Sequence, residues 1–112
     1  AAGPLDADGL LALWRKILVI HPCGTPRTRH LVTNPILDID EAAGTAQARS
    51  CFTVMQATDA LPLQIIASGR YHDRFARIDG EWCFVERDYR QLDFTGDLSQ
   101  HLRIAIKPRP QP

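Results

Sequence analysis

The stretch GRYHDRFARIDGEWCFVER, residues 69–87, decides the fold that this sequence predicts. Apolar and polar side chains alternate on both sides of the dipeptide Asp79-Gly80. This dipeptide favours a type I′ turn, because both central residues of such a turn adopt a positive φ. We therefore expect a hairpin of two long antiparallel strands, Leu63–Ile78 and Glu81–Phe94.

Strict pairing from that turn sets three pairs of cross-strand neighbours: Phe75 and Phe84, Asp73 and Glu86, and Tyr71 and Asp88. Alternation puts Gly69, Tyr71, Asp73 and Phe75 on one face, and Arg70, His72, Arg74 and Ala76 on the other. Two facing carboxylates repel each other, so Asp73 and Glu86 need a mediating cation, a proton or water. The functional interpretation is a raised carboxyl pKa at a pocket. The simpler alternative, which we favour, is a solvated rim or a register that slips by one residue. The arginines of the hairpin alternate with acidic residues, which is typical of a solvated or dimer-forming face.

Two more strands precede this hairpin, at Thr28–Ile39 and Thr45–Ala57, and residues 40–44 form the turn between them. Pro35 lies inside the first of these strands. Because proline cannot donate a hydrogen bond to a neighbouring strand, it indicates an edge strand or a β-bulge.

One amphipathic helix is predicted before the strands, over Leu5–Ile20, with Asp6 or Asp8 as its N-cap. After the last strand, Thr95–Leu102 is expected to hold a short helical turn. The ending KPRPQP, residues 107–112, is rich in proline and is predicted to be extended or frayed. One helix followed by four antiparallel strands makes an α+β fold.

The chain has 112 residues, with 13 basic and 13 acidic side chains and no net charge. This length excludes two full domains, and we expect one domain over residues 1–106 followed by the tail 107–112. Zero net charge argues against non-specific binding of nucleic acid. No apolar run approaches the roughly 20 residues of a membrane span, and no signal peptide is visible. We expect a cytoplasmic protein with neither a nucleic-acid nor a membrane partner.

Three cysteines, Cys23, Cys51 and Cys83, are far apart in the sequence and form no CxxC motif. A disulfide framework or a zinc site is therefore not expected, and reduced thiols fit a cytoplasmic protein. The sequence also has no phosphate-binding loop, dinucleotide-binding motif or nucleophile elbow. We expect neither a cofactor nor a metal.

His30 is the candidate titratable residue of the first strand. Alternation places four side chains of this strand on one face: His30, Val32, Asn34 and Ile36. A histidine suits a general base or acid because its ordinary pKa lies near neutrality. A core histidine bonded to a backbone carbonyl explains the pattern equally well. His72, on the other face of the sheet, is predicted at a surface or interface, and His21 and His101 are expected to be exposed and incidental.

Three stretches resemble the SnoaL-like family of the nuclear transport factor 2-like superfamily: Thr25–Asp40, Gly69–Arg87 and Gly96–Leu102. The resemblance implies an α+β cone, in which a strongly curved antiparallel or mixed sheet wraps round helices to form a deep, mostly apolar pocket. It also implies homodimers through the sheet face. The opening GPLDADGLLAL is similar to the segment that leads into the family's third helix, so we expect the N-terminal helices to be missing from this chain. An incomplete chain is favoured over a diverged member.

The resemblance also implies a site. Family members include polyketide cyclases, scytalone dehydratase and the small subunits of ring-hydroxylating dioxygenases. The pocket histidine of the dehydratase-type members matches His30, but the Asp that orients it and the nearby Tyr have no counterpart in this chain. Hydrogen bonds to a substrate oxygen are expected from Asn34 and Tyr71. The remaining substrate-binding positions are expected at Val32, Ile36, Phe52, Val54, Asp73 and Phe75.

We expect a small, apolar, cyclic substrate and cofactor-free acid/base chemistry, namely dehydration, isomerisation or cyclisation. The chain is thus a candidate lyase or isomerase. The alternative is a non-catalytic module that binds a ligand or dimerises, such as an accessory subunit of the ring-hydroxylating dioxygenase type.

Overall fold

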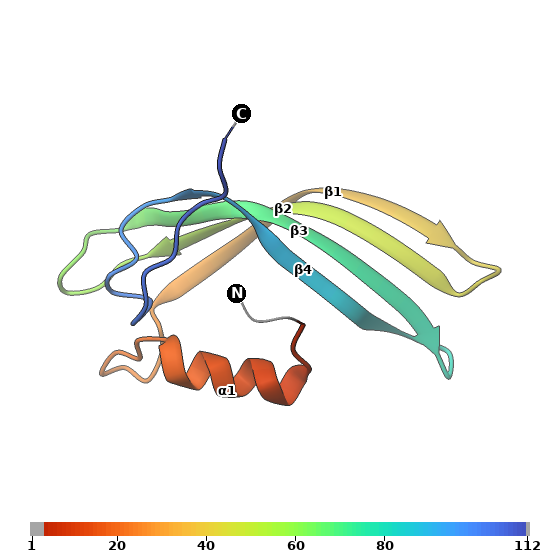
Figure 1. The fold of residues 1–112 in the computed structure, drawn as a ribbon, viewed down its shortest axis with the longest axis horizontal. Coiled ribbons are helices and arrows are strands. Elements are labelled where there is room, and N and C mark those ends of the chain that lie inside the picture. Colours follow the sequence, from red (N-terminus) through yellow and green to blue (C-terminus); the bar gives the residue numbers. More distant parts are fainter. Residues whose placement is uncertain (1–3, 112) are drawn as a thin grey trace.

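The computed structural model describes residues 4–111 and shows a four-stranded antiparallel sheet that arches over one helix (Figure 1). The strands are β1 (Thr28–Asp40), β2 (Thr45–Gln56), β3 (Gln64–Ile78) and β4 (Glu81–Thr95). They lie side by side in sequence order, so β1 and β4 are the two edges of the sheet. The predicted α+β class is confirmed, and each strand matches its predicted range to within one residue.

The turn between β3 and β4 has the backbone that the sequence predicts. Asp79 has φ 52° and Gly80 has φ 82°, and Phe75 pairs with Phe84. The two phenylalanine rings pack with their centroids 4.6 Å apart. The hairpin therefore starts in the expected register.

Beyond Phe84 the predicted pairing of β3 with β4, which assumed no bulge, is wrong. The pairing shifts between Arg74 and Phe75, and Asp73 then lies opposite Arg87 instead of Glu86. A β-bulge explains the shift, because one extra residue of β4 fits between the two pairs. The bulge removes the predicted clash of two carboxylates, as the alternative of a slipped register anticipates. Tyr71 likewise loses its predicted partner Asp88.

A second bulge bends the edge strand β1 between Thr33 and Ile36. Asn34 has a positive φ of 55° at this point, and Pro35 follows it. Pro35 thus lies in a bulge on an edge strand. Because proline has no N–H group to donate to a neighbouring strand, this is the kind of position that it favours. The bulge also inverts the alternation of β1, so that Ile36 pairs with Arg49. The expectation that Ile36 shares a face with His30 is therefore wrong.

The core lies on the inner, concave side of the arch. Its buried side chains are Phe52, Val54, Ile66, Ala67 and Tyr71, and Leu92 and Leu98 pack against them. Gly69 allows β4 and the Phe52 ring to come close to β3. A Cβ atom at Gly69 would lie 2.5 Å from the carbonyl oxygen of Gln91 and 2.7 Å from Cζ of Phe52.

Helix α1 (Ala7–Ile17) lies below the concave face without packing directly on it (Figure 1). No residue of α1 is buried, and no Cα atom of the helix comes within 8 Å of a strand Cα atom. Asp6 is the N-cap and accepts a hydrogen bond of 2.8 Å from the Gly9 N–H group. The helix is shorter at both ends than the sequence pattern predicts. No helix within residues 4–111 is long and apolar enough to cross a membrane.

The segment after β4 ties the end of α1 to the sheet. Leu18 forms a bridge with Leu102, and the Val19 N–H group donates to the His101 carbonyl over 2.9 Å. One hydrogen-bonded turn, from Leu98 to Leu102, is present where the sequence predicts a helical turn.

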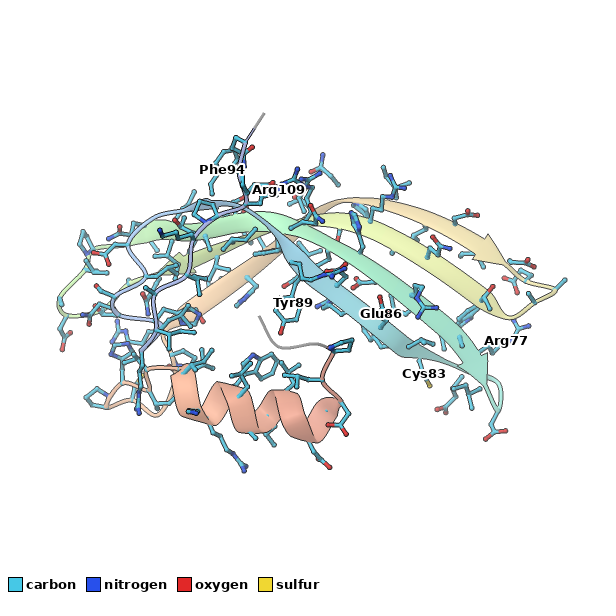
Figure 2. All side chains as sticks on the ribbon, in the orientation of Figure 1. Arg77, Cys83, Glu86, Tyr89, Phe94 and Arg109 are labelled. Carbon is cyan, nitrogen blue, oxygen red and sulfur yellow. The ribbon has the colours of Figure 1, made fainter. Side chains whose placement is uncertain are left out.

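The proline-rich tail runs along β4 near its end. The Arg109 N–H group donates to the Leu92 carbonyl over 2.7 Å. The Arg109 side chain reaches Gln91 and Asp93, and Figure 2 shows it beside Phe94 above the sheet. The tail is therefore extended, one of the two states that the sequence allows, and it covers part of this edge strand.

The substitution Gly69→Ala should lower the free energy of unfolding by about 1–3 kcal/mol, because the new methyl group overlaps the Gln91 backbone and the Phe52 ring. Gly24→Ala is the comparison, since nothing lies within 4 Å of its Cβ position and only its positive φ opposes alanine. This second change should cost about 1 kcal/mol. Urea unfolding of both variants measures the difference, and a Gly69→Ala protein as stable as the parent would contradict the close approach.

Candidate functional site

An ion pair between a buried carboxylate and a partly exposed guanidinium joins β3 and β4 on the concave face. The Asp73 side chain is 4% exposed. It accepts hydrogen bonds from Nε and Nη2 of Arg87 over 2.9 and 3.0 Å. Removing a carboxylate from water costs several kcal/mol unless a partner compensates, and a bidentate guanidinium does so with two parallel bonds. The register slip in β4 is what brings this partner opposite Asp73.

The ring of Tyr71 lies against the same guanidinium. The central carbon of Arg87 is 3.8 Å from the Tyr71 ring centroid, a close cation–π contact. The other neighbour of Tyr71 is Phe52, whose ring stacks on it at 4.5 Å between centroids. Phe52, Tyr71, Arg87 and Asp73 therefore form one continuous stack, which we call the concave stack.

Burial and charge fix the protonation of this stack. Burial raises the pKa of the Tyr71 phenol, the positive charge of Arg87 opposes that rise, and Asp73 adds to it. The hydrogen bonds to Asp73 raise the pKa of Arg87 further above its ordinary value. At neutral pH the phenol therefore keeps its proton and can donate a hydrogen bond, and the guanidinium keeps its charge.

His30 lies on β1, opposite Val54 and on the same face as the stack. The His30 side chain is exposed to solvent on one side. Its partial burial lowers the pKa of the imidazole below the ordinary value of 6.5, and the positive charge of Arg87 lowers it further. His30 and Arg87 come from the two edge strands and influence each other across the concave face. The imidazole is thus neutral at pH 7 and able to accept a proton.

The other predicted site residues lie at different distances from His30 and the concave stack. Phe52 and Val54 are buried under it, whereas Val32 is 55% exposed beside Phe52. Phe75 is half-buried further along β3, where it packs on Phe84. Asn34 lies in the bulge of β1, beyond Val32 along the strand. His30, Phe52, Val54, Tyr71 and Asp73 thus share the concave face. His30 lies level with Val54, and Asp73 lies level with Ala48, further along β2.

Two polar residues of β4 are missing from the sequence prediction. Arg87 counts there only as one of several surface arginines, and Tyr89 has no role. Figure 2 shows Tyr89 extending below β4, toward the side on which α1 lies. A buried Asp73 that needs a positive partner is the sequence signal that could identify Arg87, provided that the register slips by one residue.

Two cavities that are open to solvent lie away from the concave stack. Their volumes are about 170 and 450 Å³, and Cys23 and Arg27 line both. The Thr25 hydroxyl, 3.1 Å from the Cys23 sulfur, lowers the pKa of that thiol. Neither cavity is lined by His30 or Tyr71, and the concave face is open, with Phe84 60% exposed. Within residues 4–111 no group of three His, Cys, Asp or Glu side chains could hold a metal ion.

Comparison with known proteins places the chain in a family. A sequence profile of the SnoaL-like domain matches residues 3–88, more than half of the chain. The chain therefore belongs to the SnoaL-like family, and through it to the nuclear transport factor 2-like superfamily.

One solved structure supports the same fold. It is that of Rv3472, a protein of unknown function from Mycobacterium tuberculosis, with 35% sequence identity and a TM-score of 0.53. The match covers 61% of this chain and 38% of that one, so it spans well under half of the length of the other protein. No curated protein matches the chain significantly.

The substitution Arg87→Ala should destabilise the protein by about 2 kcal/mol, because it leaves the buried Asp73 carboxylate without its partner, although water can reach the space of the 39% exposed Arg87 side chain. Arg74→Ala is the matched control on the neighbouring pair, since Arg74 and Glu86 are 56% and 54% exposed. Losing an exposed ion pair should cost less than about 1 kcal/mol. Chemical unfolding of both variants tests this, and equal losses would show that the Asp73 carboxylate does not depend on Arg87 for its burial.

Proposed function

We propose that the chain performs cofactor-free acid/base chemistry on its concave face, with His30 as the general base. The observation that carries this proposal is that His30, Tyr71 and Arg87 lie on the same face of the sheet, where the imidazole is neutral and the phenol keeps its proton. A base and two hydrogen-bond donors are the groups that proton abstraction next to a carbonyl requires. Membership of the SnoaL-like family supports the same class of reaction.

The proposed reaction begins when His30 removes a proton from the carbon next to a substrate carbonyl. Negative charge then develops on the carbonyl oxygen. Tyr71 can stabilise it through its hydroxyl, and Arg87 can do so through Nη1, which makes no hydrogen bond within residues 4–111. Loss of a β-hydroxyl group as water, with the proton returned from His30, completes a dehydration. Return of the proton to another carbon would give an isomerisation instead.

The apolar side chains around these groups suggest the substrate class. Val32, Phe52 and Val54 flank His30 and the stack with hydrocarbon surface, and Phe75 extends that surface along β3. A ring with one or two polar substituents would cover this surface and leave its oxygen near Tyr71. We therefore propose a small, apolar, cyclic hydroxy-carbonyl compound as substrate, with Asn34 and Asp73 as further polar positions. The natural substrate is expected to share this chemistry.

A non-catalytic ligand-binding module is the second candidate. It is favoured by the absence of a hydrogen-bond partner for His30 within residues 4–111, because a general base is ordinarily oriented by such a partner. An accessory subunit of the ring-hydroxylating dioxygenase type belongs to this class. Binding without turnover separates this candidate from the first one.

Replacing His30 by Gln should lower kcat/KM by about a hundredfold or more for a cyclic β-hydroxy ketone that the parent protein dehydrates, because the base is lost. Turnover of a panel of such compounds is followed by the absorbance of the enone product. His72→Gln is the control, since His72 lies on the opposite face of the sheet, next to Asp88. Unchanged turnover in His30→Gln would remove His30 from the reaction, and binding of the panel without turnover by the parent would favour the second candidate.

We also propose a homodimer through the convex face of the sheet. Ile36 and Leu31 of β1 are 67% and 44% exposed on this face, and Phe94 of β4 is 62% exposed. These apolar side chains lie at the two edges of the convex face, with Arg49, Arg70 and His72 between them. An interface with an apolar part and a polar part would fit this pattern. The three cysteines are free, which fits the cytoplasmic location that we propose.

The substitution Ile36→Lys should convert the dimer to a monomer, because a charge would have to be buried in the interface. Leu37→Lys is the matched control, since Leu37 pairs with Ala48 on the concave face and is 63% exposed. Light scattering at micromolar concentration measures the mass of each protein. A monomeric parent chain, or a monomer produced equally by both substitutions, would contradict the convex interface.

A further inference from the structure

The larger of the two open cavities, with a volume of about 450 Å³, is not used by the proposed reaction. The loop before β1 supplies Cys23, Thr25 and Arg27 to its wall, and β1 itself supplies Arg29. The loop before β3 completes the wall, and Figure 1 shows both loops at the same end of the molecule. We call this space the Arg27 cavity.

The Arg27 cavity carries positive charge without a balancing negative charge. Arg27 and Arg29 both line it, and no acidic side chain of residues 4–111 does. Neither guanidinium lies within 4 Å of a carboxylate in this part of the chain, whereas every arginine of β3 and β4 pairs with one. Asp59 lines only the smaller cavity. Both arginines of the Arg27 cavity are therefore available to an anion.

The loop fixes the direction of the Arg27 side chain. The backbone of Arg27 has a φ of 57°, a conformation that is uncommon for a residue with a side chain. Its N–H group donates to the Thr25 hydroxyl over 3.2 Å, and its Nε donates to the Ala57 carbonyl over 2.6 Å. Nη1 and Nη2 make no hydrogen bond within residues 4–111. They form a positioned fork of two donors, the geometry that binds a carboxylate through both oxygens.

The thiol of Cys23 lies beside this fork and is exposed. The Thr25 hydroxyl, 3.1 Å from the sulfur, lowers the pKa of the thiol most, and the charge of Arg27 lowers it further. The positive charge of Arg27 is thus felt at the wall of the cavity. Cys23 also provides a natural chemical reporter of any molecule bound there.

The remaining wall of the Arg27 cavity is largely apolar. Met55 of β2 is the cross-strand partner of Arg29, and Leu63, which precedes β3, is 71% exposed. A space of this size holds a small organic molecule. A bare inorganic anion would leave Met55 and Leu63 in contact with water, whereas an anion with a hydrocarbon group would cover both.

We propose that the Arg27 cavity binds a small organic carboxylate that carries an apolar ring or chain. The carboxylate accepts hydrogen bonds from Nη1 and Nη2 of Arg27, and Arg29 adds a second positive charge. The apolar group lies on Met55 and Leu63. His30 and Tyr71 do not line this cavity, so the proposal is independent of the proposed reaction. Because both guanidinium groups are exposed to solvent, we expect binding to weaken as the salt concentration rises.

The test is an NMR titration of the unmodified protein with benzoate, a carboxylate on an apolar ring. The backbone amide signals of Thr25, Arg27 and Arg29 should shift and saturate. Benzyl alcohol has the same ring without the charge, and it should bind about tenfold more weakly or less tightly still, because charge-assisted hydrogen bonds are lost. Benzoate should also slow the alkylation of Cys23 by iodoacetamide, a neutral reagent, since the bound molecule lies beside the thiol.

Two variants assign the binding to the cavity. Arg29→Gln removes a charge and no side-chain hydrogen bond of the described residues, so it should fold normally and weaken benzoate binding about fivefold. Arg27→Gln should weaken it more, because the fork is lost. Arg103→Gln is the matched control, since Arg103 is exposed and lines neither cavity. Backbone amide spectra check the fold of each protein.

Three results would each overturn the proposal. They are the absence of a saturable shift with benzoate, equally tight binding of benzyl alcohol, and shifts spread over all exposed arginines, which would indicate non-specific attraction of anions. Unchanged binding by a folded Arg29→Gln or Arg27→Gln protein would overturn it as well. If neither variant folds, the comparison of benzoate with benzyl alcohol still decides, because it uses the unmodified protein.

Discussion

The ion pair between Asp73 and Arg87 is the interaction on which the concave face depends. A carboxylate in the middle of a sheet is costly unless a cation meets it with good geometry, and the bidentate contact provides this. The same guanidinium lies on the Tyr71 ring and, through that ring, on Phe52. One side chain of β4 thereby connects the polar and the apolar halves of the inner surface.

The arrangement of charge follows from this pair. Partial burial lowers the pKa of the His30 imidazole, and the positive charge of Arg87, which Asp73 holds in place, lowers it further, so the imidazole is neutral at pH 7. Burial keeps the proton on Tyr71. The concave face is open and α1 stands away from it, so a ligand of moderate size can reach these groups from solvent. Membership of the SnoaL-like family establishes the scaffold, and the choice of reaction depends on this local chemistry.

The strands, the β3–β4 turn and the face that carries Tyr71 and Asp73 can be predicted from alternation and from the Asp79-Gly80 dipeptide. The bulges cannot, because a single extra residue leaves the pattern of apolar and polar residues almost unchanged. Arg87 therefore escapes prediction as the partner of Asp73. The half-buried position of His101 also escapes prediction, since Val19, which bonds its backbone, is far from it in the sequence.

The most direct test of the concave stack is the NMR spectrum of the arginine side chains. If Arg87 is bound by Asp73 and lies on Tyr71, its Nε–H proton should exchange slowly with water, and its Cδ protons should be shifted upfield by the Tyr71 ring. Arg74, whose ion pair is exposed, provides the reference within the same hairpin. A fast-exchanging Nε–H proton and unshifted Cδ protons on Arg87 would contradict the concave stack, and with it the electrostatic origin of the site.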